Sequence, residues 1–144
     1  VVGIVIAIIG ILSSIILASM SNARIRSRDA RRVADIRQLQ SALELYADAH
    51  DAASPDNLSL LAPDYIPAIS TDPLGGAYNY TACATAYHLA AGLEEQSNPS
   101  LQSDRDLAVN TVCPTDAING TLDANNSTAA CASGTGRSCY DVSP

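Results

Sequence analysis

Cysteine is the residue type in this chain best suited to covalent chemistry, and its four copies all lie in the C-terminal half: Cys83, Cys113, Cys131 and Cys139. An even number of cysteines in a loop-rich region dense in Gly, Asn, Ser and Thr is typical of two disulfide bonds formed in an oxidising compartment. Four cysteines allow three pairings. We favour Cys131–Cys139, which would close a glycine-rich loop, together with Cys83–Cys113, which would tie a strand to the C-terminal region.

The patterns of the other reactive side chains do not predict a metal site or an active site. The sequence has no Cys-x-x-Cys pair, and its two histidines, His50 and His88, do not cluster with the cysteines, so a zinc site is not expected. Four aspartates could bind calcium but lack EF-hand spacing, and we interpret them as solvated acids: Asp104, Asp106, Asp116 and Asp123. Because HExxH, phosphate-loop and Ser/His/Asp patterns are also missing, we predict a protein that is not an enzyme and needs no cofactor.

Charge is divided sharply along the chain, which has a net charge of −7 and no lysine. Residues 24–37 hold six of the eight arginines and two aspartates, a net charge of +4, whereas the rest of the chain carries −11. Under the positive-inside rule, a basic block after an apolar run marks the cytoplasmic side of a membrane. The cysteines indicate the opposite, and we follow them because the arginines have another use, as partners of an acidic region.

The arginine block is predicted to form ion pairs between copies of the chain. The residues expected to make these intersubunit contacts are Arg24, Arg26, Arg28, Arg31 and Arg32. The alternative interpretation is a solvated polar face of a helix. Nucleic acid is not a required partner, because the overall charge is strongly negative and no aromatic residues are interleaved with the arginines.

The first 20 residues carry no charge, and within residues 1–17 only two glycines and two serines interrupt aliphatic and alanine side chains. A helix that is apolar on every side must be surrounded by lipid or by other helices. The pattern then turns amphipathic, with one apolar stripe that is expected to pack against a globular head: Val33, Ile36, Leu39, Leu43 and Tyr46. Residues 51–57 form a stop signal, so residues 1–50 are predicted to form one protruding helix of about 75 Å.

The remainder predicts a small head built on an antiparallel sheet. A short helical turn is expected over residues 58–62, started by Asn57, and a proline- and glycine-rich crossing follows. Residues 77–83 and 85–93 have the composition of two strands joined by a tight turn, residues 111–113 could form a third, and the rest is expected to be mostly loop. The predicted fold is therefore α+β, with an apolar helix half (1–22), an amphipathic helix half (23–52) and a disulfide-bonded head (53–144).

The order of these segments resembles that of bacterial type IV pilins and the related pseudopilins of type II secretion systems. The resemblance is carried by the run Ala-Ile-Ile-Gly-Ile-Leu at residues 7–12, Arg-Asp-Ala-Arg-Arg at 28–32 and Ala-Leu-Glu-Leu-Tyr at 42–46. It continues through Tyr-Ile-Pro at 65–67 and Thr-Asp-Pro-Leu-Gly-Gly-Ala-Tyr at 71–78, and so covers residues 1–93. Two family features are missing: a glutamate that would fall near Val1, and a proline that would fall near Ala18.

The resemblance implies the major structural subunit of an extracellular filament that supports adhesion, twitching motility or DNA uptake. Its partners would be itself, the inner membrane before assembly, the pilus assembly machinery and a prepilin peptidase. The residues that would form the filament core are Val1, Val2, Gly3, Ile4, Val5, Ile6, Ala7, Ile8, Ile9, Gly10, Ile11, Leu12, Ser13, Ser14, Ile15, Ile16 and Leu17. Two alternatives stay open: a pseudopilin of a type II secretion system, and a binding domain anchored by a single membrane span.

Overall fold

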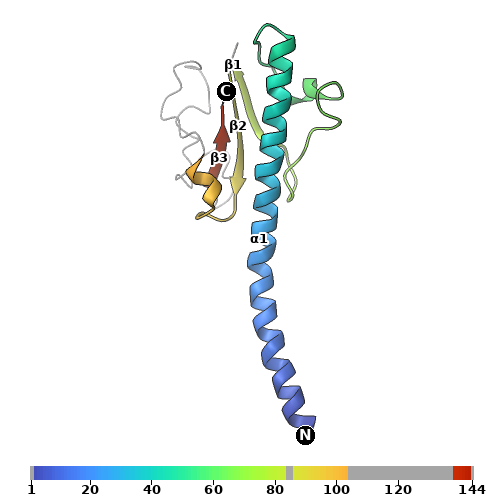
Figure 1. Ribbon diagram of the computed structural model, residues 1–144, viewed down its shortest axis with the longest axis vertical. Helices are drawn as coiled ribbons and strands as arrows, with labels where there is room; N and C mark the ends of the chain where they lie inside the picture. Colours follow the sequence, from blue (N-terminus) through green and yellow to red (C-terminus); the bar gives the residue numbers. More distant parts are fainter. Residues whose placement is uncertain (1, 84–85, 104–137, 144) are drawn as a thin grey trace.

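The computed structural model describes residues 2–83, 86–103 and 138–143, and it has one long helix beside a small sheet. The helix α1 (Val2–Ala49) has 48 residues, which corresponds to about 72 Å at about 1.5 Å per residue. Its first half extends away from the head, and its second half lies against the sheet (Figure 1). The predicted single protruding helix is confirmed over residues 2–49.

The sheet has three antiparallel strands in the order β1-β2-β3. β1 (Asn79–Cys83) and β2 (Ala86–Leu93) form the hairpin that the sequence predicts, each within two residues of the expected bounds. β3 (Ser138–Val142) pairs with the other edge of β2, placing Tyr140 opposite Ala91. The expectation of loop in this last part was wrong for β3, and the strand expected at 111–113 lies outside the described residues.

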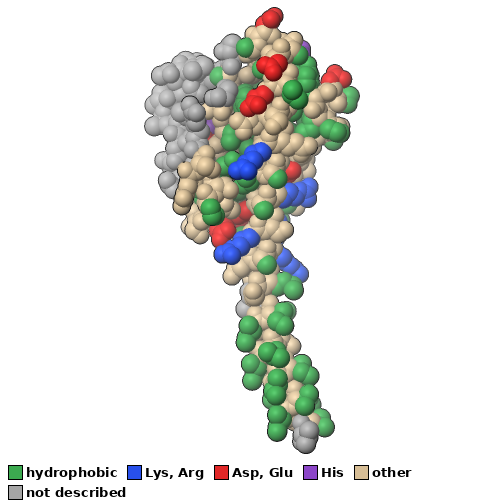
Figure 2. Space-filling model, in the orientation of Figure 1, with side chains coloured by type: hydrophobic (Ala, Val, Ile, Leu, Met, Phe, Trp, Pro, Cys, Tyr) green, Lys and Arg blue, Asp and Glu red, His purple; other side chains and the backbone are tan. Residues whose placement is uncertain are grey.

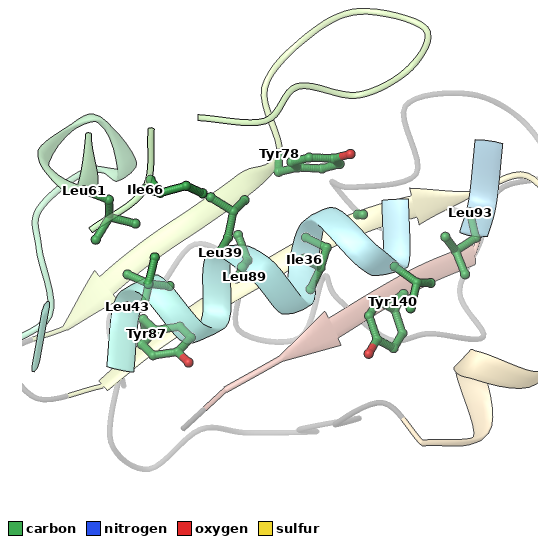
Figure 3. Close-up of a cluster of buried hydrophobic side chains, with 13 residues drawn as sticks. Ile36, Leu39, Leu43, Leu61, Ile66, Tyr78, Tyr87, Leu89, Leu93 and Tyr140 are labelled. Atoms are coloured by element: carbon green, nitrogen blue, oxygen red, sulfur yellow. The ribbon is translucent and has the colours of Figure 1, made fainter. Parts of the chain in front are cut away.

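The hydrophobic core lies between one face of the sheet and the second half of α1. Leu39 and Leu43 of the helix meet Leu89 of β2, and all three are almost fully buried (Figure 3). The rest of the predicted stripe also belongs here: Val33 and Ile36 are buried, and Tyr46 lies partly buried against the same cluster. Each fully buried aliphatic side chain contributes about 1.5–3 kcal/mol, so this contact holds the helix on the head.

Three short features complete the head. The single-turn helix η1 (Leu58–Leu61) starts where expected, because the Asn57 side chain accepts a hydrogen bond from the Ser59 amide. Its Leu61 is fully buried in the core. A second such turn, η2 (Pro99–Gln102), follows β2. On the crossing between η1 and β1, the Tyr78 hydroxyl donates to an Asp35 carboxylate oxygen at 2.7 Å and so ties the crossing to α1.

Just after the C-terminal end of α1, two residues that are not glycine have backbone angles in the left-handed region. Asp51 has φ 52° and Ala52 has φ 64°, and the Ala52 amide donates to the Ala47 carbonyl at 2.9 Å. A side chain in this region is sterically disfavoured. Ala52→Gly is therefore expected to raise the free energy of unfolding by about 0.5–1 kcal/mol, measured by urea denaturation. Ala53→Gly, outside that region, is the matched control, and equal stabilisation by both variants would contradict the explanation.

Candidate functional site

The first half of α1 exposes apolar side chains on all its sides. Every large aliphatic residue from Val2 to Leu17 keeps at least 50% of its surface exposed, and Val2 itself is 73% exposed. Figure 2 shows these side chains covering the stalk below the head. By length and composition α1 could cross a membrane, and none of its most apolar window is buried in the described structure. All predicted core residues from 2 to 17 thus lie on this surface, which is called the apolar stalk below.

Small residues interrupt the apolar stalk at points where another backbone could approach. A methyl group added at Gly3 or Gly10 would meet no atom within 4 Å outside its two neighbours and the backbone of its own helix. Ser14 lies four residues after Gly10, and its hydroxyl donates to the Ile11 carbonyl at 2.8 Å. The hydroxyl is therefore satisfied within the helix, which lowers the free-energy cost of placing it among apolar groups. Close helix–helix contact at small residues is the usual way in which apolar helices associate.

A buried guanidinium lies on the head-bound half of α1, 15 residues beyond the apolar stalk. Arg32 is fully buried, and its Nε and Nη2 donate to the two Asp72 carboxylate oxygens at 2.5 and 3.0 Å. Its Nη1 lies 2.7 Å from Asp29 Oδ1 and 2.7 Å from Glu94 Oε1. A buried charge is tolerated only when it is paired and hydrogen-bonded, and Arg32 meets both conditions. These four residues are called the Arg32 cluster below.

The Arg32 cluster joins three segments that are distant in the sequence. Asp29 of α1 accepts hydrogen bonds from the Glu94 and Glu95 amides, just beyond β2, at 3.0 and 2.8 Å. Asp72 belongs to the crossing, in a turn where the Gly75 amide donates to its carbonyl at 2.8 Å. Gly75 has φ +97°, which only glycine adopts without strain. The cluster therefore fixes the angle at which the helix leaves the head.

The structure corrects part of the predicted intersubunit charge set. Arg32 cannot face another copy of the chain, because its guanidinium is enclosed by carboxylates of its own subunit. Arg28 also pairs within the chain, donating to both Glu94 oxygens at 2.8 and 2.6 Å. The surface of the block is instead formed by Arg24 and by Arg26 and Arg31, whose side chains are 72% and 63% exposed. For these three the intersubunit role stays a prediction.

The cluster shifts the ionisation of Glu94. The pKa of Glu94 is lowered from 4.5 to about 2, first by the hydrogen bonds that Arg28 donates, and then by the hydrogen bond and the positive charge of Arg32. The hydrogen bonds with Glu94 raise the pKa of Arg28, and those with Asp72, Glu94 and Asp29 raise the pKa of Arg32 against its burial, so all three groups are charged near neutral pH. A lowered carboxyl pKa contributes stability that is complete above the unfolded pKa and lost as the pH falls through the folded one.

The stability of the head is therefore expected to fall between about pH 4.5 and pH 2, in part through Glu94. Glu94→Gln removes the titrating group, so the variant should be less stable at neutral pH and show a shallower loss over that window. Urea unfolding at a series of pH values measures this. Glu44→Gln, at an exposed position on α1, should keep the wild-type slope. A Glu94→Gln profile parallel to that of the wild type would contradict the assignment.

The sheet face opposite the core holds a second buried polar pair. His88 of β2 and Asp141 of β3 are both buried, and His88 Nε2 lies 2.7 Å from Asp141 Oδ2. His88 is thus a packed residue that links two strands. The four aspartates that we interpret as solvated acids, and Val1, lie outside the described residues.

The strand register restricts the cysteine pairings. Cys83 lies opposite Ala86 and Cys139 opposite Gly92, six residues apart on β2, or about 20 Å at about 3.3 Å per residue. Because a disulfide requires Cα atoms within about 7 Å, a Cys83–Cys139 bond is excluded. Two arrangements stay open, because Cys113 and Cys131 lie outside the described residues: the favoured one, and the one that joins Cys83 to Cys131 and Cys113 to Cys139.

None of the protein-family models, curated proteins and solved structures compared with the chain matches it.

Proposed function

We propose that the chain is the structural subunit of a type IV pilus-like filament, a major pilin that polymerises helically through its apolar stalk. The observation that carries the proposal is the continuity of α1. One half of the helix packs an apolar stripe against the head, and residues Val2 to Leu17 of the other half have their large aliphatic side chains at least half exposed. No catalytic role or cofactor forms part of the proposal.

The exposed apolar side chains of the stalk gain free energy when lipid or other helices replace the water around them. Burial of its eleven large aliphatic residues is worth tens of kcal/mol at about 25 cal/mol/Å² of apolar surface. Lipid and a bundle of identical helices satisfy that term about equally well, because both remove the same surface from water. A subunit could therefore pass from a membrane pool into a filament at a small net free energy. This supports an inner-membrane precursor and an extracellular polymer.

The exposed arginines offer a means of setting the register between subunits. Arg24, Arg26 and Arg31 are exposed on α1 beyond the stalk, whereas the part of the chain outside residues 24–37 has a charge of −11. Each exposed ion pair contributes only about 0–1 kcal/mol, so these contacts would select an arrangement rather than drive assembly. The helix bundle would supply the stability. Prepilin peptidase and the pilus assembly machinery are the partners that this scheme requires.

Electron microscopy of material sheared from the cell surface tests the proposal. Long filaments composed of this chain are expected, and cryo-electron microscopy of them should place residues 2–17 of neighbouring copies in contact along the axis. Short, machine-bound assemblies with loss of protein secretion on deletion would favour the pseudopilin alternative. A detergent-released monomer with no filaments would favour the single-span anchored domain and would contradict both filament roles.

A further inference from the structure

A small cavity lies at the base of the head, next to the end of the apolar stalk. It has a volume of about 310 Å³ and is lined by three residues of α1 and two that follow β2: Asn22, Ile25, Arg26, Glu94 and Glu95. Figure 2 shows basic and acidic side chains side by side in this region. The cavity belongs to neither the core nor the buried Arg32 guanidinium, although Glu94 contributes to its wall.

The position of the cavity corresponds to the headgroup layer of a membrane that holds the stalk. Residues 2–20 extend about 28 Å as a helix, close to the hydrocarbon thickness of about 30 Å in a typical bilayer. Asn22, Ile25 and Arg26 occupy the next turn and a half of the same helix. If the apolar residues fill the hydrocarbon layer, the cavity lies level with phosphate and headgroup atoms. This step rests on the membrane-inserted precursor of the proposed function.

The charges of the cavity are of both signs. Arg26 uses Nε to contact Glu95 Oε1 at 3.2 Å, and its side chain is 72% exposed. Glu95 is 23% exposed. Glu94 differs, because its two carboxylate oxygens already accept from Arg28 and Arg32. The cavity therefore offers one guanidinium and one carboxylate, which contact each other through Arg26 Nε and Glu95 Oε1 and come from different segments of the chain.

This pair matches a headgroup that carries a phosphate and a primary ammonium. A guanidinium binds phosphate oxygens with several N–H donors, and a carboxylate accepts from an ammonium, which has three N–H donors. A choline headgroup has the same charges but no N–H to donate. An anionic headgroup would satisfy Arg26 while leaving Glu95 close to a second negative charge. We infer that the cavity is a site for the phosphoethanolamine headgroup of a membrane lipid, held by Arg26 and Glu95 before the subunit is extracted.

Native mass spectrometry of the full chain tests this inference. The chain is reconstituted in nanodiscs of equal parts phosphatidylethanolamine, phosphatidylglycerol and phosphatidylcholine, and the lipids retained on release are counted. The wild type should retain phosphatidylethanolamine over each of the other two by about threefold, which corresponds to about 0.7 kcal/mol. Arg26→Gln and Glu95→Gln should each bring retention to the bulk ratio. Arg37→Gln, at an exposed arginine about three turns further along α1, should keep the preference.

The outcomes separate this inference from the proposed function. Retention at the bulk ratio by the wild type, or preference for phosphatidylglycerol, would overturn the phosphoethanolamine site while leaving filament formation unaffected. The same holds if Arg26→Gln and Arg37→Gln behave alike. A chain that prefers phosphatidylethanolamine in the membrane but forms no filaments on the cell surface would support the site and contradict the pilin role.

Discussion

Arg32→Ala is expected to lower the free energy of unfolding by about 3–5 kcal/mol, the largest effect of any single substitution considered for the head. The guanidinium is fully buried and contacts Asp29, Asp72 and Glu94. Its removal would leave these carboxylates close together without their cation. Repulsion and the loss of four hydrogen bonds both act against the folded state. Urea unfolding of the full chain in detergent, followed by tyrosine near-ultraviolet circular dichroism, measures the change.

Arg31→Ala is the matched control for this substitution. Arg31 is the neighbouring residue on α1, but its side chain is 63% exposed and its closest contact, with Asp35, is 3.8 Å long. Its removal should change stability by less than about 0.5 kcal/mol. If Arg32→Ala cost no more than Arg31→Ala, the cluster would not hold the helix to the head in the way that its geometry indicates.

Gly10→Leu is expected to abolish filament formation while leaving the subunit folded. A Cβ added at this position meets no atom within 4 Å outside its two neighbours and the backbone of its own helix, and the surrounding aliphatic residues are exposed, so the isolated subunit can accommodate a side chain there. Leucine also favours the helix over glycine by about 1 kcal/mol. Between packed helices, however, four additional heavy atoms at a small-residue position would push the backbones apart. Electron microscopy of sheared material should show no filaments, with membrane insertion unchanged.

Gly10→Ala provides a graded control, since it adds only one methyl group. It should form filaments, fewer or less stable than those of the wild type. Circular dichroism and the unfolding midpoint of both variants should match the wild type or exceed it. Normal filaments from Gly10→Leu would show that this face of the helix is not a subunit contact, and would leave the anchored-domain alternative in the stronger position.

The parts of the fold that follow local rules could be predicted from the sequence. The uncharged run and the stripe that contains Ile36, Leu39 and Leu43 predict one helix with two different environments, as observed. The hairpin was also predicted, because its strands are neighbours in the sequence and carry tyrosine, threonine and apolar alternation. β3 was not, because Ser-Cys-Tyr-Asp-Val has weak alternation and its partner β2 lies more than 40 residues earlier. A pairing of that kind leaves no local signature.

The Arg32 cluster was missed for a related reason. A sequence pattern assigns arginine to the surface by default, and the carboxylates of Asp72 and Glu94 come from segments 40 and 62 residues away. One signal was present, because positions 29, 32, 36, 39 and 43 continue the spacing of the buried stripe. Asp29 and Arg32 thus occupy the inward face of α1. A charged pair on such a face indicates a buried ion pair rather than a solvated one.

The unbroken course of α1 has a mechanical consequence for any polymer built from this chain. The helix is continuous over all 48 residues and has no proline that would kink it, so the stalk and the head-bound half form a single rod. A pull along the axis would reach the sheet directly, through the ion pairs around Arg32. Such a polymer would lengthen under load by sliding of neighbouring rods, and its breaking strength would depend on lateral contacts rather than on the covalent backbone.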